Sequence, residues 1–400
     1  MHAALIALLL ALSLAPGQLK ANPTTPGSDT QVLERLPFKP GDPVAREMAS
    51  LRTQLQRDPK NPALAAQLAR KYYSLVAEEG DPRYLGYAQA ALAPWWEMAQ
   101  PPDEIQVLRA SLRQFRHDFD GAISDLNAVL TRQPGNTQAR ALRATIHIVQ
   151  ARYPQGRSDC SALHSNGSTG NELIATACEA MADGLSGKSS QAFNQLQQAL
   201  NQALQERAKP SAADQLWVRL RLAELAQRLG RNAEAEAQYQ SAIRLGIMDT
   251  FLFAAWADFL LDQGRFQEVI TLLKDKTRSD TLLLRLALAE HALRPRPGEA
   301  NRITLTNRYA AAQLRGDTAH QQEEARFALR IENNAQKALK LAQENWKVQR
   351  EPRDARIFLE AALALHDAAA AQPVLQWLRQ SQHEDPALLN LAKQLGSGGK

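Results

Sequence analysis

The chain has 400 residues, of which 44% are hydrophobic, 22% charged and 6% aromatic, with a formal net charge of +5. This hydrophobic content excludes an intrinsically disordered chain, and the small positive excess contains no Lys/Arg block of the nucleic-acid-binding type. Ala, Leu and Gln dominate while β-branched residues are few, which favours an all-α fold.

The first residues of the chain have features of a secretory signal peptide, which predicts that the protein is exported. Residues 3–15, AALIALLLALSLA, form an apolar run of 13, shorter than the roughly 20 residues that span a bilayer. Pro16 and Gly17 end the run, and the small residue Ala21 follows. This layout is typical of a secretory signal peptide cleaved after residue 21, although no Lys or Arg precedes the apolar run. We therefore expect a periplasmic protein whose mature chain has no stable membrane insertion.

The chain then repeats itself at an interval of 34 residues. LRASLRQFRHDF at 108–119 corresponds to LRATIHIVQARY at 142–153. LAELAQRLGRNAEAEAQYQSAI at 222–243 corresponds in the same way to WADFLLDQGRFQEVITLLKDKT at 256–277. The matches preserve residue size as well as identity, and they include Ala223 with Ala257, Gly230 with Gly264, Ala235 with Val269, and Tyr239 with Leu273.

This period and its small residues resemble the tetratricopeptide repeat (TPR), a helix–turn–helix unit. When one unit is numbered from Leu216, Ala223 and Ala235 take the two small places at which the paired helices cross. Gly230 takes the turn, where a residue with positive φ ends the first helix. The bulky Tyr239 fills the groove against the next unit. One such hairpin cannot bury its own apolar face, so units stack.

The resemblance implies an all-α, right-handed superhelical solenoid of roughly eight or nine helical hairpins. It is specific over 103–163 and 216–275 and weaker elsewhere. The expected segments are a signal peptide (1–21), a linker with a lead-in helix (22–60), a TPR-like array (61–275), degenerate helical repeats (276–395) and a disordered tail (396–400).

Cys160 and Cys178 are the only cysteines, and an oxidising compartment favours their pairing. A middle unit starting near Asn171 places the two residues on facing sides of a unit junction, which also favours a disulfide. A redox-active pair is the alternative, but there is no Cys-x-x-Cys spacing to lower a thiol pKa.

The resemblance also implies which residues face the concave groove. Trp217 and Phe251, 34 residues apart, form a possible aromatic step, that is, a pair of rings that could receive the apolar side chains of an extended or helical peptide. Arg228, Asp258 and Asp262 would then fix the position of the charged residues of that peptide. The alternative is that both aromatic residues pack on the preceding unit and the charges are only solvated. The expected partner-binding residues are Trp217, Glu224, Gln227, Arg228, Phe251, Asp258 and Asp262.

A second possible recognition surface is NWKVQREPRDAR at 345–356, where Trp346 and Arg350 are residue types that anchor interfaces. A helix end followed by a helix capped by Asp354 explains the same stretch.

The sequence offers little chemistry. His320, Glu323 and Glu324 share one helical face and are weak candidates for a metal site, which needs a second ligand helix. NGS at 166–168 has the form of a glycosylation acceptor. No phosphate loop, nucleophile elbow or zinc-ligand spacing is present, and no cofactor is indicated. The favoured function is a non-enzymatic exported scaffold that binds a protein or peptide partner. The alternatives are an accessory factor for envelope assembly or secretion and a metal-handling periplasmic protein.

Overall fold

The computed structural model describes residues 41–164, 169–293, 299–314, 316 and 320–397, and within these ranges the chain forms α-helices and no strand. The predicted signal peptide, most of the predicted linker, the NGS stretch and residues 398–400 lie outside the described residues. The chain divides into two units, Met1–Ala49 and Ser50–Lys400. The described part of the first is residues 41–49, in which helix α1 (Pro43–Arg57) begins.

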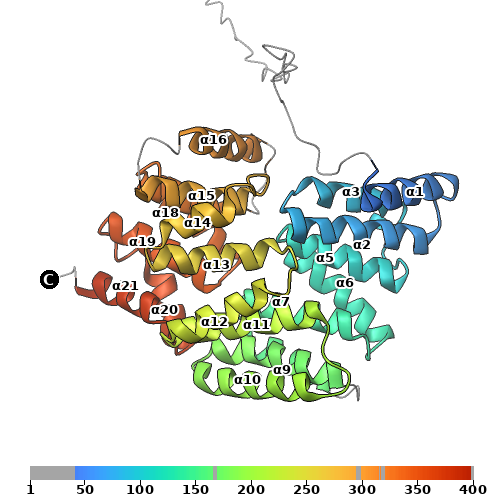
Figure 1. The fold of residues 1–400 in the computed structure, drawn as a ribbon, viewed down its shortest axis with the longest axis horizontal. Coiled ribbons are helices and arrows are strands. Elements are labelled where there is room, and N and C mark those ends of the chain that lie inside the picture. The colour runs from blue at the N-terminus through green and yellow to red at the C-terminus, as the bar shows by residue number, and fades with distance from the viewer. Residues whose placement is uncertain (1–40, 165–168, 294–298, 315, 317–319, 398–400) are drawn as a thin grey trace, which may run out of the picture. The chain divides into compact units, whose positions relative to one another are not determined.

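Within Ser50–Lys400 the helices pair as successive hairpins, drawn from blue to red in Figure 1. The hairpins described are α2 (Pro62–Glu79) with α3 (Arg83–Ala91), α5 (Asp103–Phe115) with α6 (Phe119–Arg132), α7 (Thr137–Val149) with α8 (Tyr153–Ser161), α9 (Thr169–Gly184) with α10 (Ser189–Gln205), α11 (Ala212–Arg228) with α12 (Asn232–Ile243), α13 (Thr250–Asp262) with α14 (Phe266–Leu273), α15 (Asp280–Leu293) with α16 (Glu299–Leu314), α17 (Gln321–Arg330) with α18 (Ala335–Val348), and α19 (Pro352–Ala364) with α20 (Gln372–Gln380). The short α4 (Ala93–Trp96) follows the first hairpin, and α21 (Pro386–Ser397) packs on α19. The predicted all-α array of eight or nine hairpins is confirmed.

The repeat positions have the packing that the sequence predicted. Ala223 and Ala235 are both fully buried where α11 crosses α12, and Tyr239 is buried beside them. Gly230 and Gly264 have φ of 69° and 70°, the left-handed conformation that ends the first helix of each unit.

The same turn position is left-handed even where the residue is not glycine. His117 and Ala151 have φ of 61° and 60°, at the corresponding place of the units that begin at Asp103 and Thr137. A non-glycine residue in this conformation costs about 1 kcal/mol or more. The Ala151 methyl group offsets part of that cost, because it packs against two of the hydrophobic clusters.

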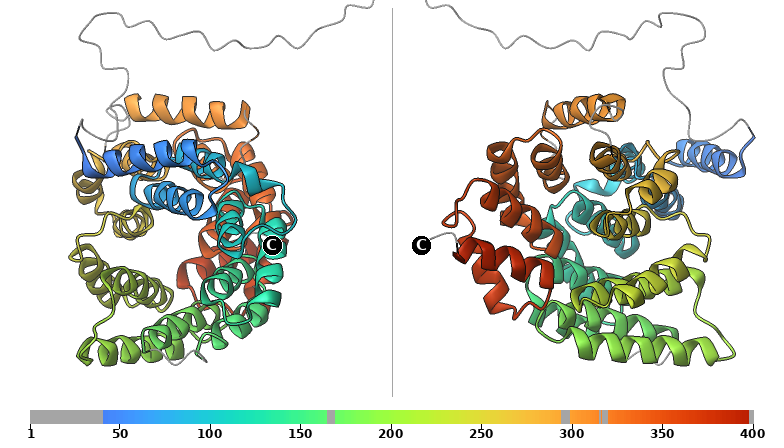
Figure 2. Two further views of the ribbon diagram at one scale, coloured as in Figure 1. Left: turned by 90° about the vertical axis from the view of Figure 1, so that its right-hand side faces the viewer. Right: turned by 60° about the vertical axis from the view of Figure 1, so that its left-hand side comes forward.

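Hairpins that are distant in the sequence meet because the array curls, as Figure 2 shows. The end of α2 contacts α13 and the loop before α15: Thr250 Oγ1 donates to the Glu78 carbonyl at 3.5 Å, and Arg278 pairs with Asp81 at 3.3 Å. Further along the chain, the Arg350 amide donates to the Val149 carbonyl at 2.8 Å. The C-terminal helices thereby belong to the same compact unit as the clear repeats.

Candidate functional site: the inner face of the hairpin array

Phe251, at the start of α13, is one of the predicted groove residues that remain exposed. Its side chain is 47% exposed. It stands edge-on to Phe115 of α5, with ring centroids 6.5 Å apart, and Phe115 stands edge-on to Tyr73 of α2 at the same distance. These three residues, which we call the aromatic row, come from the first helices of three hairpins. Tyr73 and Phe115 are not among the groove residues that the sequence predicts.

Trp217, the other half of the predicted aromatic step, lies differently. It is half-buried and packs against two hydrophobic clusters, one centred on the middle hairpins and one around the Cys160–Cys178 pair. The alternative interpretation, in which Trp217 and Phe251 both pack on the preceding unit, fits the position of Trp217, whereas Phe251 remains exposed.

The two aspartates among the predicted groove residues are engaged within the chain. Asp258 accepts hydrogen bonds from Arg285 of α15 at 2.8 Å and from Arg326 of α17 at 2.6 Å. Burial alone would raise the pKa of the Asp258 carboxyl, but the two guanidinium groups outweigh burial and hold that pKa well below its usual range. Asp262 accepts two hydrogen bonds from Arg356 of α19. The first helices of four hairpins are therefore joined across this face.

The polar residues predicted on α11 also have neighbours in the chain. Glu224 pairs with Arg221 at 3.0 Å, and Gln227 accepts a hydrogen bond from the Tyr239 hydroxyl at 2.5 Å. Arg228 lies against Gly184. Burial, together with the charge of Arg228, lowers the pKa of His383 to about 3, so this imidazole is neutral at physiological pH.

Trp346 and Arg350, the second predicted recognition pair, lie at the end of α18. Trp346 is only 5% exposed and belongs to the C-terminal hydrophobic cluster. Arg350 is exposed, and its Nε donates to the Trp346 carbonyl at 3.3 Å. Asp354 is buried and accepts the Glu351 amide at 2.9 Å as the third residue of α19. The stretch is a helix end followed by a new helix, as the alternative interpretation required, but the cap residue is Glu351 rather than Asp354, which completes a capping box with it.

Cys160 and Cys178 form a disulfide in the structure, joining α8 to α9. Both residues are buried, and the bond lies within a cluster that includes Ala144 and Ile148 of α7. The disulfide therefore ties two successive units together at their junction.

The three weak metal-ligand candidates have other partners or positions. Glu323 accepts from Arg285 at 2.7 Å and from the Thr281 hydroxyl at 2.9 Å. Glu324 pairs with Lys337 at 3.0 Å, and His320 precedes the helix as its cap residue. Within the described ranges, no group of three His, Cys, Asp or Glu side chains is arranged to hold a metal ion.

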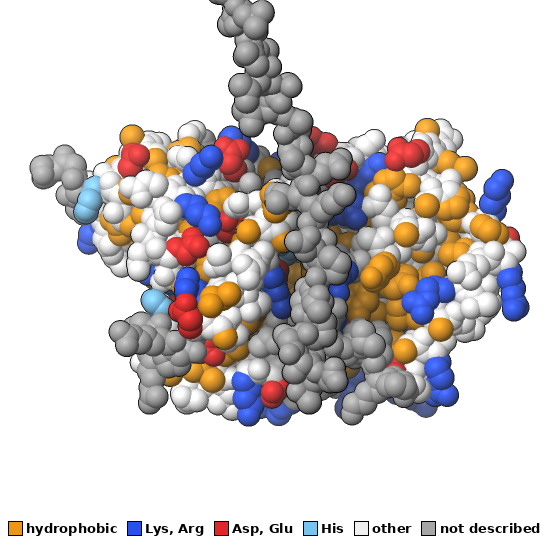
Figure 3. Space-filling model, turned by 90° about the horizontal axis from the view of Figure 1, so that it is seen from above, with side chains coloured by type: hydrophobic (Ala, Val, Ile, Leu, Met, Phe, Trp, Pro, Cys, Tyr) orange, Lys and Arg blue, Asp and Glu red, His pale blue; other side chains and the backbone are white. Residues whose placement is uncertain are grey.

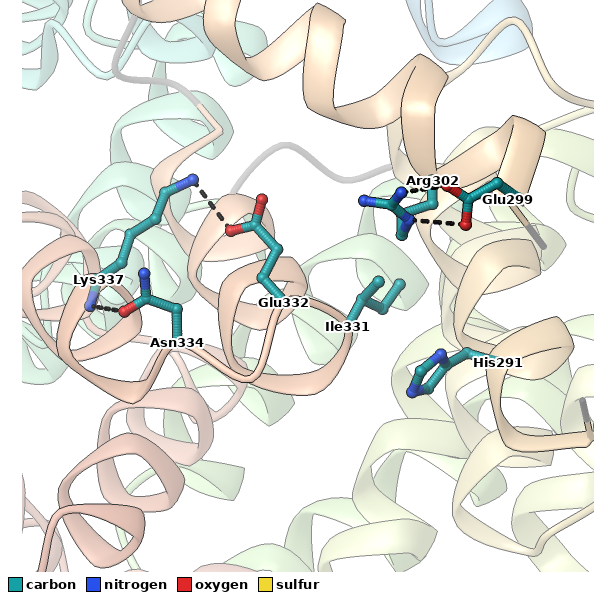
Figure 4. A pocket seen from close by; sticks show the side chains of 7 residues that line it. All are labelled: His291, Glu299, Arg302, Ile331, Glu332, Asn334 and Lys337. Atoms are coloured by element: carbon teal, nitrogen blue, oxygen red, sulfur yellow. Dashed lines mark hydrogen bonds and ion pairs between the residues drawn. The ribbon is translucent and has the colours of Figure 1, made fainter. Parts of the chain in front are cut away.

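A polar pocket of about 690 Å³ lies between α15, α16 and the turn that joins α17 to α18 (Figure 4). Its cations are already paired: Arg302 binds Glu299, and Lys337 binds Glu332 at 3.2 Å. The dashed lines in Figure 4 mark these pairs. The pocket thus presents ion pairs that are satisfied within the chain.

Hydrophobic side chains are unevenly distributed on the face drawn in Figure 3, where they gather over the N-terminal hairpins on the right. Tyr87 of α3 is 51% exposed and packs on Tyr72, with ring centroids 5.4 Å apart.

No helix in the part of the chain that the structure covers is long and apolar enough to cross a membrane.

No protein-family model matches the chain, and no curated protein matches it. Solved structures do resemble it. A tetratricopeptide repeat protein from Parabacteroides merdae is 16% identical with a TM-score of 0.43, over 66% of this chain and 91% of its own. Yeast Tom70 is 13% identical with a TM-score of 0.37, and the match covers 88% of this chain and 96% of Tom70. The pentatricopeptide repeat protein PPR10 from maize is 13% identical with a TM-score of 0.28, and the match covers 89% of this chain and 50% of PPR10. These are helical-repeat proteins, and the likeness concerns the fold alone.

Proposed function

We propose that this chain is an exported, non-enzymatic scaffold that binds a protein or peptide partner through the inner face of its hairpin array. A repeat array presents an extended surface on a framework whose units hold one another in place. Here arginine–carboxylate pairs also join α13 to α15, α17 and α19. Such a surface suits the recognition of a partner better than it suits catalysis.

The observation that carries the proposal is the aromatic row. Aromatic side chains supply large contact areas at interfaces, and rings held edge-on by their neighbours lose little further freedom on binding. Phe251 is the exposed end of the row, while Phe115 and Tyr73 support it from behind. We expect an apolar side chain of the partner to pack on Phe251.

Two features support export to the periplasm. The apolar segment at residues 3–15 has the layout of a signal peptide. The disulfide is stable in an oxidising compartment and would be reduced in the cytosol. The proposed mature protein begins after Ala21.

The test uses a photo-crosslinking amino acid at position 251 in the full chain, expressed in a Gram-negative host. The matched control places the same amino acid at Leu314 of α16, which is 75% exposed but lies outside the aromatic row. We expect a discrete adduct from position 251 in the periplasmic fraction, on a chain that begins near residue 22. Equal adducts from both positions would contradict binding at the aromatic row, and a chain that retains residues 1–21 in the cytosol would contradict export.

A further inference from the structure

A second pocket, separate from the aromatic row, lies where the third hairpin meets the C-terminal helices. Its volume is about 360 Å³, within the usual range of about 300–1,000 Å³ for small-ligand sites. The lining includes Tyr153 of α8, Trp346 and Arg350 at the end of α18, and Gln376, Trp377 and Gln380 on α20. The third and the last two hairpins build it together, so it exists only because the array curls.

The inner wall of this pocket is aromatic and rigid. Trp346 and Trp377 are 5% and 6% exposed and stand edge to face, with ring centroids 5.4 Å apart. The Trp377 indole N–H donates to the Tyr153 hydroxyl at 2.9 Å, so the polar atom of the ring is satisfied within the wall. A wall of this kind favours a flat, apolar group.

The mouth of the pocket is polar and positively charged. Gln376 and Gln380 are one helical turn apart on α20, and both are exposed. Within the described ranges of the chain, the side-chain amide groups of Gln376 and Gln380 have no hydrogen-bond partner. The Nη atoms of Arg350 likewise have no hydrogen-bond or ion-pair partner among the described residues. The Arg350 Nε is held by the Trp346 carbonyl, which keeps the guanidinium group beside the aromatic wall.

The carboxylate that neighbours this mouth has its own cation. Glu351 pairs with Arg353 at 2.8 Å and accepts a hydrogen bond from Gln349. Arg350 is therefore left to interact with a group from outside the chain, and a guanidinium beside two amides suits a carboxylate.

We propose that this pocket binds an aromatic carboxylate: the ring packs on Trp346 and Trp377, and the carboxylate accepts hydrogen bonds from Arg350 and the two glutamines. The same chemistry occurs in a free aromatic acid and in a peptide that places an acidic residue next to an aromatic one. The site does not depend on the aromatic row, so either one can fail without the other.

The test titrates the full mature chain by calorimetry with 3-phenylpropionate, its neutral amide, and the blocked dipeptide N-acetyl-Phe-Glu-amide. We expect binding of at least one of the two acids and binding of the neutral amide that is about tenfold weaker, because a charged hydrogen bond is lost. Tighter binding of the free acid identifies a small-molecule ligand, and tighter binding of the dipeptide identifies a peptide ligand. Absence of binding by both acids at millimolar concentration would overturn the proposal.

Three variants locate the site. Arg350→Gln is expected to weaken binding about tenfold. The control Arg379→Gln removes an exposed arginine of α20 that does not line the pocket, and it should leave binding unchanged. Gln376→Trp is expected to abolish binding, because the larger side chain fills the pocket from an exposed position. Melting temperatures near that of the parent chain show that the variants are folded. Equal weakening by Arg350→Gln and Arg379→Gln, or full binding by folded Gln376→Trp, would overturn the assignment.

Discussion

Arg356 and Asp262 form a two-pronged ion pair across 94 residues of sequence: Nη1 donates to Oδ2 at 2.7 Å and Nη2 donates to Oδ1 at 2.8 Å. The pair joins α19 to α13 on the face predicted to receive a partner. The two side chains remain 38% and 32% exposed, so water screens their attraction. We expect Asp262→Asn to lower the free energy of unfolding by less than about 1 kcal/mol. Urea denaturation measures this change, and a loss of several kcal/mol would show that the pair is a main support of the fold.

The pair formed by Arg285 and Glu323 contrasts with it, because both side chains are buried, at 2% and 10% exposure. Arg285→Met is expected to cost about 3–5 kcal/mol, since it leaves the Glu323 carboxylate buried without a cation. The double variant Arg285→Met/Glu323→Gln should recover part of this loss, because the uncompensated charge is gone. If the double variant is as unstable as the single one, lost packing rather than charge sets the cost.

Trp217 and Phe251, which the sequence pairs as one aromatic step, should respond differently to truncation. Trp217→Ala is expected to cost about 2 kcal/mol, less than the 3–5 kcal/mol of a fully buried tryptophan, because its half-buried ring packs on two clusters. Phe251→Ala should change the melting temperature little, since the ring is 47% exposed, but should reduce partner capture. Thermal melting and crosslinking yield, measured on both variants, separate the two roles.

Contacts within one hairpin can be predicted from the sequence, whereas contacts between hairpins that are distant in the sequence cannot. The 34-residue interval between Arg109 and Arg143 is visible in the sequence and helps to place the helical hairpins. The structure shows why both arginines recur: Arg109 bonds Asp125 and Arg143 bonds Asp159, each 16 residues ahead, between the two helices of one hairpin. Asp125 and Asp159 are also 34 residues apart, so the sequence alone contains the signal for both ion pairs.

The contacts between distant hairpins left no comparable signal. Nothing near Asp258 in the sequence indicates that its partners are Arg285 and Arg326, because the curl of the array brings those helices together. The same applies to the hydrogen bond between Trp377 and Tyr153, 224 residues apart. Local periodicity fixes each hairpin, whereas the angle between successive hairpins depends on the sum of many small packing contacts.

The disulfide provides a test that needs no partner. Reducing the bond between Cys160 and Cys178, which are 18 residues apart, should lower the free energy of unfolding by about 3 kcal/mol in the chain-entropy model. Urea denaturation with and without reductant measures the difference. The Cys160→Ser/Cys178→Ser variant is the control, and it should show low stability that does not respond to reductant. An unchanged midpoint on reduction of the parent chain would mean that packing alone holds the α8–α9 junction.

Asp354 should make stability depend on pH. Burial, together with the negative charge of Glu351, raises the pKa of Asp354 to about 7, from an ordinary value of 3.8. Between these two values the folded chain binds more protons at this site than the unfolded chain does. The contribution of Asp354 to stability is therefore complete below about pH 4 and is lost as the pH rises through about 7.

Asp354→Asn removes this titration while its side-chain oxygen can still accept the Glu351 amide hydrogen. We expect the variant to be more stable than the parent chain at pH 8, and the difference to shrink towards pH 4.5. Urea denaturation at the two pH values measures the effect, with Asp120→Asn, a change at an exposed aspartate, as the control. A variant that is less stable at pH 8 would show that the Asp354 carboxylate is ionised in the folded chain and supports α19 as an anion at the start of the helix.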